Sequence, residues 1–154
     1  MNKIANFIEI RAFSNPEDDY DKVYNAFISL LPSFEYEEES KKPKPTVKNT
    51  QGFEEKTIRM IEIKLEKNKH INDFIKKLAS NLSDDQKELL VRQADSRLDE
   101  HLHFFLRLDK EKLQNNEYLM TDSGDCYHVK IGLSCFPAKR EKAIELIGEI
   151  FGKT

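Results

Sequence analysis

The segment 126–136 constrains the fold most, because apolar and polar residues alternate along it almost without exception. Every second residue from Tyr127 to Cys135 is Tyr, Val, Ile, Leu or Cys, and His128 and Lys130 occupy positions between them. Since successive side chains of a β-strand point to opposite faces, the pattern predicts a strand that is buried on one face only. The same alternation predicts three further strands, at 3–13, 57–66 and 102–108.

Between these strands the apolar residues recur at spacings of three and four, which is typical of helices that pack on a sheet through one face. Pro16 and the acids after it open the first helix, and the run 83–86 is a capping-box pattern that opens the third. A short strand is expected at 118–121. The predicted order is β-α-β-α-α-β-β-β-α, an α+β fold in which helices pack mainly on one face of an antiparallel sheet.

The segment 33–53 differs from the rest of the chain in composition. It runs from acids to lysines and contains two prolines and one glycine. We interpret it as a flexible surface connection within a single domain, residues 1–154. Its basic cluster can contact a phosphate backbone, although such runs are usually only solvated. The cluster consists of Lys41, Lys42, Lys44 and Lys48.

Charge and hydropathy exclude several classes of protein. The 25 Lys and Arg residues against 28 Asp and Glu residues give a net charge of −3, which argues against a surface that attracts polyanions everywhere. No stretch approaches the roughly 18 apolar residues that a membrane span needs, so no membrane contact is expected. The two cysteines cannot build a disulfide framework, and a reducing cytoplasm is the expected compartment.

The remaining positions of the predicted strands place aromatic and cationic side chains on the sheet face away from the helices. They are Phe7, Arg11, Phe13, Met60, Lys64, His103, Phe105, Arg107, His128 and Lys130. Aromatic rings stack on unpaired bases and cations contact phosphates, so this face can bind RNA. Two other interpretations stay open: the face is a homodimer interface, or the two middle helices cover it. Glu9 and Glu62 on the same face weaken the RNA interpretation.

The sequence offers little for an enzyme. It has five glycines, no glycine-rich phosphate loop and no G-x-S-x-G motif. Facing histidines such as His103 and His128 can seed a metal site, but surface or stacking histidines are far commoner. The run 122–125 is typical of a turn in which Gly124 supplies a positive φ. We therefore expect no catalytic residue, no metal and no cofactor.

Three short motifs of the C-terminal half are ordered and spaced as in a known family. They are LRLDK at 106–110, TDSGD at 121–125 and FPAKREKA at 136–143, and the N-terminal strand that ends in RAF is similar too. Over most of its length the chain resembles an archaeal family of predicted RNA-binding or exosome-associated proteins. The resemblance implies a fold like that of ribosomal protein L5, an RNA-associated role in the archaeal cytoplasm and no catalytic residue.

Basic residues at the start of the last helix are candidates for RNA contact. Cations there are poorly placed for the helix dipole but well placed to bind a phosphate together with free backbone N–H groups. The alternative is a solvated helix start whose lysine stems cover the sheet edge. The expected phosphate-binding residues are Lys139, Arg140 and Lys142, joined by Arg107 and Lys110 from a neighbouring strand, with His103 and Phe105 as stacking partners.

These features together predict a non-catalytic RNA-binding protein associated with archaeal RNA processing. Its expected partners are RNA, bound weakly or moderately because of the net charge of −3, and subunits of an RNA-processing complex. The alternative is a homodimeric interaction or scaffold protein that does not contact RNA itself.

Overall fold

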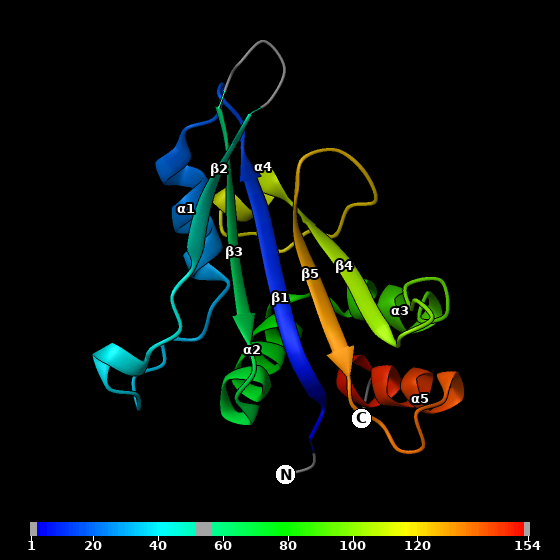
Figure 1. Ribbon diagram of the computed structural model, residues 1–154. Helices are drawn as coiled ribbons and strands as arrows, with labels where there is room; N and C mark the ends of the chain where they lie inside the picture. Colours follow the sequence, from blue (N-terminus) through cyan, green and yellow to red (C-terminus); the bar gives the residue numbers. More distant parts are fainter. Residues whose placement is uncertain (1–2, 52–56, 153–154) are drawn as a thin grey trace.

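The computed structural model describes residues 3–51 and 57–152 and confirms the predicted α+β fold class. Five antiparallel strands form one sheet in the order β2-β3-β1-β5-β4 (Figure 1). The strands are β1 (Ala5–Ser14), β2 (Thr46–Gln51), β3 (Thr57–Leu65), β4 (His103–Asp109) and β5 (Cys126–Leu133). The helices are α1 (Tyr20–Ser29), α2 (Asn68–Asn81), α3 (Asp84–Arg92), α4 (Lys110–Gln114) and α5 (Arg140–Phe151), with a 3-10 turn at Glu39–Lys41.

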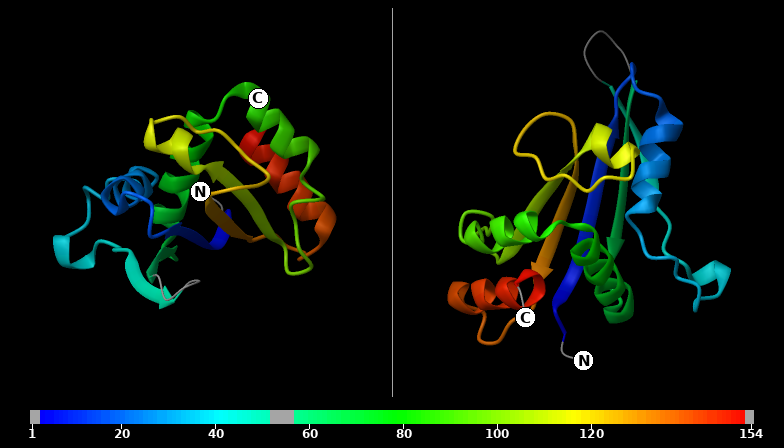
Figure 2. Two further views of the ribbon diagram at one scale, coloured as in Figure 1. Left: turned by 90° about the horizontal axis from the view of Figure 1, so that it is seen from above. Right: turned by 180° about the vertical axis from the view of Figure 1, so that it is seen from behind.

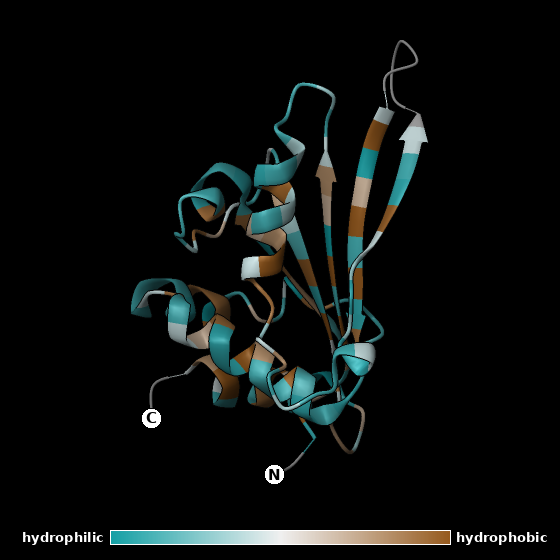
Figure 3. Ribbon diagram, turned by 90° about the vertical axis from the view of Figure 1, so that its left-hand side faces the viewer, coloured by the Kyte–Doolittle hydropathy of each residue, from teal (hydrophilic) through white to brown (hydrophobic). Residues whose placement is uncertain are grey.

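The helices lie on one side of the sheet and leave the other face open (Figures 2 and 3). Helices α1 and α2 pack on the central strand β1, and the apolar stripes of α2 and α3 point into the core through Phe74 and Leu90. The middle helices therefore do not cover the cationic and aromatic face, and that interpretation is wrong. The inward positions predicted from the alternation are confirmed, since Leu106 and Ile131 are both buried.

The strand register arranges the side chains of the open face in rows that cross the sheet. Cross-strand neighbours on one face lie close enough to interact, so these rows decide which charges meet. One row runs Glu62, Arg11, His128, Arg107 from β3 to β4. The next row runs Lys64, Glu9, Lys130, Phe105 in the same direction.

The segment 33–53 differs from the prediction in its second half, where β2 pairs with β3 along its whole length. The charges and prolines of this segment favour a surface connection, but Pro43 and Pro45 both precede β2. Thr46, Val47 and Thr50 are β-branched residues, which favour extended backbone. Earlier in the segment, Glu37 accepts hydrogen bonds from Lys67 and His70 of the α2 region at 2.8 and 2.9 Å.

Two smaller differences concern the chain between β4 and β5. The short strand expected at 118–121 is reduced to a single bridge between Met120 and Leu108. The polar stretch before it forms α4, whose first turn is capped by the Asp109 carboxylate accepting from the Lys112 N–H at 2.9 Å. Gly124 has φ of +81°, which confirms the predicted turn. Among the described residues, no helix has the length and apolar character of a membrane span.

Candidate nucleic-acid interface

The open sheet face carries a shallow groove of about 360 Å3 that extends from β1 across β5 to β4. We call its outer part the β4–β5 half, which comprises Phe105, Arg107, His128 and Lys130. Phe105 is 40% exposed, whereas its neighbour Phe104 on the other face of β4 is fully buried. The Lys130 ammonium lies 6.0 Å from the centre of the Phe105 ring. An exposed ring beside a cation offers a base one surface for stacking and its phosphate one charge.

Phe7 of β1 extends this aromatic surface toward the end of the sheet. Its ring lies over Gly132 of β5, where a Cβ atom would collide with the ring. The Lys64 and Lys130 ammonium groups lie 4.9 and 5.7 Å from the ring centre, within cation–π distance. His103 packs edge-on against Phe7 at 5.3 Å. The absence of a side chain at Gly132 thus lets two strands present one continuous aromatic surface.

His128 lies at the middle of the face, between Arg11 of β1 and Arg107 of β4. Burial, together with these two guanidinium groups, lowers the pKa of His128 below its ordinary value. The ring is therefore uncharged at neutral pH. Its Nε2 lies 3.5 Å from the Cys126 Sγ, and Phe13 packs edge-on against it at 6.4 Å.

The other part of the face, which we call the β1–β3 half, contains acids as well as cations. Glu62 accepts a hydrogen bond from Arg11 at 3.2 Å and forms an ion pair with Lys48 of β2 at 3.4 Å. Glu9 stands directly opposite both Lys64 and Lys130. A phosphate approaching this half meets Arg11 and Lys48 already paired with Glu62, and carboxylates that repel it.

Lys110, predicted to bind phosphate, is buried and engaged inside the protein, which corrects that prediction. It is 6% exposed, and its ammonium donates to the Phe13 carbonyl at 2.6 Å and to the Asp18 carboxylate at 2.9 Å. Burial alone would raise the pKa of Asp18, but hydrogen bonds from the Asn15 N–H and Lys110 outweigh it and lower the pKa. Lys110 therefore joins α4 to the end of β1 and does not face RNA.

Arg140 is also engaged within the protein, at the N-terminus of α5. Its guanidinium pairs with the Asp95 carboxylate and donates to the carbonyl oxygens of Leu98 and Asp99 at 3.0 and 3.4 Å. These contacts connect the start of α5 to residues 95–99, which precede β4. The Arg140 guanidinium is thus engaged with Asp95, Leu98 and Asp99, and the prediction that it forms a phosphate site with the β4 cations is corrected accordingly.

Lys139 and Lys142 are exposed at the start of α5, and Lys142 lies 3.4 Å from Glu145. Arg140, which lies between them in the sequence, binds residues 95–99 and not the outward side chains of β4. The five predicted phosphate ligands are therefore not brought together. Arg107 alone of this group lies on the open sheet face.

The two predicted stacking residues differ in their availability. Phe105 is exposed, whereas the His103 Nδ1 lies 3.3 Å from the Asp99 carboxylate and its ring packs on Phe7. Sequence reasoning placed Lys130 on this face without including it among the site residues. The alternation along β5 and the pairing of β5 with β4 predict that Lys130 lies beside Phe105.

The described residues provide no basis for a metal centre, since no three of their His, Cys, Asp or Glu side chains are grouped to hold an ion. His103 and His128, considered as a metal pair from the sequence, have separate partners. His103 packs on Phe7, and His128 packs on Phe13. Aromatic rings and cations are thus the chemistry of this face.

Comparison with known proteins gives one consistent family. The model of a family described as RNA binding matches residues 7–133, from β1 to the end of β5. The RNA-binding protein PAB1135 of Pyrococcus abyssi is 28% identical over 145 residues, which cover 94% of this chain and 92% of the relative. The crystal structure of protein AF2318 from Archaeoglobus fulgidus is 29% identical, with a TM-score of 0.80 over 95% of this chain and 99% of that chain.

A second solved structure agrees with these matches. Mth689, a DUF54 protein from Methanothermobacter thermautotrophicus, is 25% identical, with a TM-score of 0.75 over 96% of this chain and 98% of that chain. Because the family match extends over most of the sequence and the fold agrees throughout, this chain belongs to the protein family described as RNA binding.

Proposed function

We propose that this protein binds RNA without catalysis, through the β4–β5 half of its open sheet face. The observation that carries the proposal is the exposed Phe105 ring between Lys130 and Arg107 on a face that no helix of the described chain covers. Sheet faces that combine aromatic rings with cations bind single-stranded RNA by stacking bases on the rings and pairing phosphates with the cations.

The family match and the charge distribution support this location over the start of α5. The matched range 7–133 includes all the strands except the first two residues of β1, and it ends before Lys139. None of the four residues that define the β4–β5 half is an acid, and Glu9 of β1 is the one acid that lines its groove among the described residues. A protein with a net charge of −3 can bind RNA through such a local patch, because the potential near the patch depends on its own basic residues.

RNA processing is the cellular context that we propose, with subunits of a processing complex as further partners. The support is the resemblance of the motifs at 106–110 and 121–125 to an archaeal family with exosome-associated members. The ribosomal protein L5-like fold implied by that resemblance stays a prediction.

Binding of short single-stranded RNA to the Phe105→Ala variant, measured by fluorescence anisotropy, tests the proposal. Base stacking on an aromatic ring contributes about 1–3 kcal/mol, so we expect the affinity to fall at least about fivefold. Phe136→Ala is the matched control, because Phe136 is 97% exposed but follows the end of β5 and does not line the groove of the open face. Absence of RNA binding by the unaltered protein at low salt would remove the proposal.

The alternative function, a homodimer through the same face, is favoured by the exposed Phe105 as well. Light scattering of Phe105→Glu separates the two functions. Conversion of a dimer to a monomer would favour the interface, whereas an unaltered monomer that has lost RNA affinity favours the RNA surface.

A further inference from the structure

A second hollow lies around the edge of β4, next to the open face. It has a volume of about 440 Å3 and is lined by Arg97, Phe105, Arg107 and Asp122, among others. Phe105 and Arg107 line both this edge groove and the groove of the open face. The two hollows are therefore neighbours along the path that a bound strand would follow across β4.

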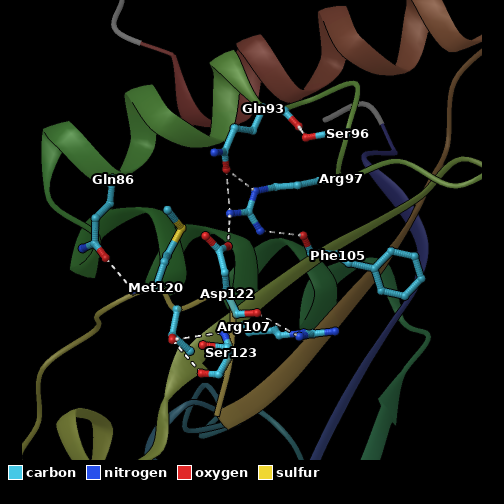
Figure 4. Close-up of polar contacts among 10 residues, drawn as sticks. Gln86, Gln93, Ser96, Arg97, Phe105, Arg107, Met120, Asp122 and Ser123 are labelled. Atoms are coloured by element: carbon cyan, nitrogen blue, oxygen red, sulfur yellow. Dashed lines mark hydrogen bonds and ion pairs between the residues drawn. The ribbon is translucent and has the colours of Figure 1, made fainter. Parts of the chain in front are cut away.

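Arg97 is the central feature of the edge groove (Figure 4). Its side chain is only 12% exposed. The Gln93 side-chain oxygen accepts from its Nε at 3.0 Å and its Nη2 at 2.7 Å, and the Phe105 carbonyl accepts from its Nη1 at 3.3 Å. These partners are neutral, so they fix the orientation of the guanidinium without cancelling its charge.

The carboxylate that faces Arg97 is held weakly. The Asp122 side chain is 87% exposed, and its Oδ1 lies 3.5 Å from the Arg97 Nη2. Exposed ion pairs of this kind contribute little, because water competes for both charges. The Arg107 guanidinium approaches the same residue from the other side and donates to the Asp122 carbonyl at 3.3 Å.

The loop that carries Asp122 is itself well anchored. The Thr121 N–H donates to the Arg107 carbonyl at 3.0 Å, and the Met120 N–H donates to the Gln86 side-chain oxygen of α3 at 2.7 Å. Only the side chain of Asp122 needs to turn away for the space between Arg97 and Arg107 to become available. Rotation of one exposed side chain is a small change.

We infer that the edge groove is a phosphate subsite, in which a phosphate diester of bound RNA takes the place of the Asp122 carboxylate between Arg97 and Arg107. The inference rests on the proposed RNA-binding function and extends it. Arg97 donates to the phosphate through Nη2, the nitrogen that faces Asp122, and Asp122 competes with the RNA for that contact. A base stacked on Phe105 places its phosphate toward this edge.

The test compares RNA affinities of variants by fluorescence anisotropy with the same single-stranded RNA. Asp122→Asn should raise the RNA affinity about threefold to tenfold, because the Asp122 carboxylate no longer opposes the attraction between the RNA phosphate and Arg97. Glu39→Gln is the matched control, because it removes an exposed carboxylate at a distant 3-10 turn. Equal gains for both variants would show a general charge effect and overturn the inference.

Arg97→Gln should lower the affinity about tenfold and reduce the steepness of the log–log salt dependence by about 0.7, the share of one phosphate contact on a single strand. The affinity of Arg97→Lys should fall between the two, since Lys keeps the charge but loses the forked contact with Gln93 that orients it. Circular dichroism confirms that each variant is folded, and Asp122→Asn tests the inference independently of any change at Arg97.

The outcomes separate this inference from the proposed function. If Phe105→Ala weakens RNA binding while the Arg97 and Asp122 variants leave it unchanged, the edge subsite is excluded and the RNA surface stands. If the unaltered protein binds no RNA, both are excluded. If adenosine monophosphate displaces the RNA fully at an equal nucleotide concentration, the groove binds a mononucleotide, and the inference of a strand phosphate is overturned.

Discussion

The two halves of the open sheet face contain the same kinds of residue but differ in how the charges are paired. In the β1–β3 half, Glu62 lies between Arg11 and Lys48 and pairs with both. In the β4–β5 half, neither Lys130 nor Arg107 has a carboxylate within ion-pair distance among the described residues. The comparison teaches that a cation on this face stays available when no carboxylate comes within ion-pair distance, which the register alone does not decide, since Glu9 stands opposite Lys130.

Arg107 and Lys110 show a similar contrast over three positions of the chain. Arg107 projects outward from β4, whereas Lys110 turns inward at the start of α4 and binds Asp18. Their charges are the same in the sequence. The contacts of Lys110 with the Phe13 carbonyl and the Asp18 carboxylate distinguish a cation that is part of the interior from one that faces solvent.

We expect the largest effect at Lys110, where a substitution should lower the free energy of unfolding and leave RNA affinity unchanged. Lys110→Met leaves the Asp18 carboxylate without its buried partner, which should lower the free energy of unfolding by about 3 kcal/mol. Lys112→Met, on the exposed side of the same helix, should change it by less than about 1 kcal/mol. Urea denaturation measures both. A folded Lys110→Met variant with lowered RNA affinity would break the contrast with Arg107.

Paired substitutions compare the two halves directly. Arg107→Ala with Lys130→Ala should lower RNA affinity by about 100-fold and reduce the salt dependence by about 1.4, because two phosphate contacts are lost. Arg11→Ala with Lys48→Ala removes the same formal charge, but from cations already paired with Glu62. We expect a loss of less than about threefold there. Equal losses would contradict the distinction between the halves.

Gly132 of β5 leaves the space in which the Phe7 ring lies, so that Phe7 and the β4–β5 half form one aromatic surface. Gly132→Ala should displace the Phe7 ring and lower the free energy of unfolding by about 1–3 kcal/mol, the usual cost of overpacking. Gly148→Ala in α5 is the control, because a Cβ there meets nothing within 4 Å. That control should be neutral or stabilising by up to about 1 kcal/mol. Thermal denaturation of both variants shows whether the close approach to Phe7 matters.

Glu62 should be the residue that keeps the β1–β3 half from binding RNA. Glu62→Gln releases Arg11 and Lys48, so this half should come to resemble the other, and RNA affinity should rise about threefold. Titration of single-stranded RNA against this variant and the unaltered protein measures the change. An affinity that stays the same would mean that the path of the RNA does not include β1.

The smallest effect concerns His128, between the halves. Its lowered pKa means that it gains a proton only as the pH falls below its ordinary value of about 6.5. Protonation places a third cation between Arg11 and Arg107, so RNA affinity should rise a few-fold between about pH 7 and pH 5. His128→Gln should remove this rise.

The stability of the free protein should move in the opposite direction over the same pH window. The unfolded chain takes up the His128 proton more readily than the folded chain, so the free energy of unfolding should fall as the pH drops below about 6.5. Urea denaturation at several pH values, with His128→Gln as the control, checks the sign. A stability that rises on acidification through this window in the unaltered protein alone would contradict the lowered pKa.

Much of the scaffold could be predicted because it depends on periodicity. The alternation along β5 placed Ile131 inside and Lys130 outside, and both positions are confirmed. β2 was missed because an edge strand needs no apolar face, and its lysines and neighbouring prolines resemble a loop. Val47, its apolar residue, is exposed.

The site could be predicted only in part. Phe105 and Arg107 follow from the alternation of β4, which the structure confirms. The position of Arg97 could not be predicted from periodicity, because Arg97 lies in the irregular turns after α3. Its contacts with Gln93 and Phe105 determine where its guanidinium lies. Arg140 was selected for its charge and its place at a helix start, and neither property indicates that Asp95 and Leu98 bind it.

The sequence by itself determined the layers of this protein and which side chains leave the core, because alternation and helical spacing act over neighbouring residues. The tertiary structure decided which outward cations are free, since Glu62, Asp18 and Asp95 reach their partners from distant parts of the chain. Charges interact through space and not along the sequence, so pairing appears only once the strands and helices are in place.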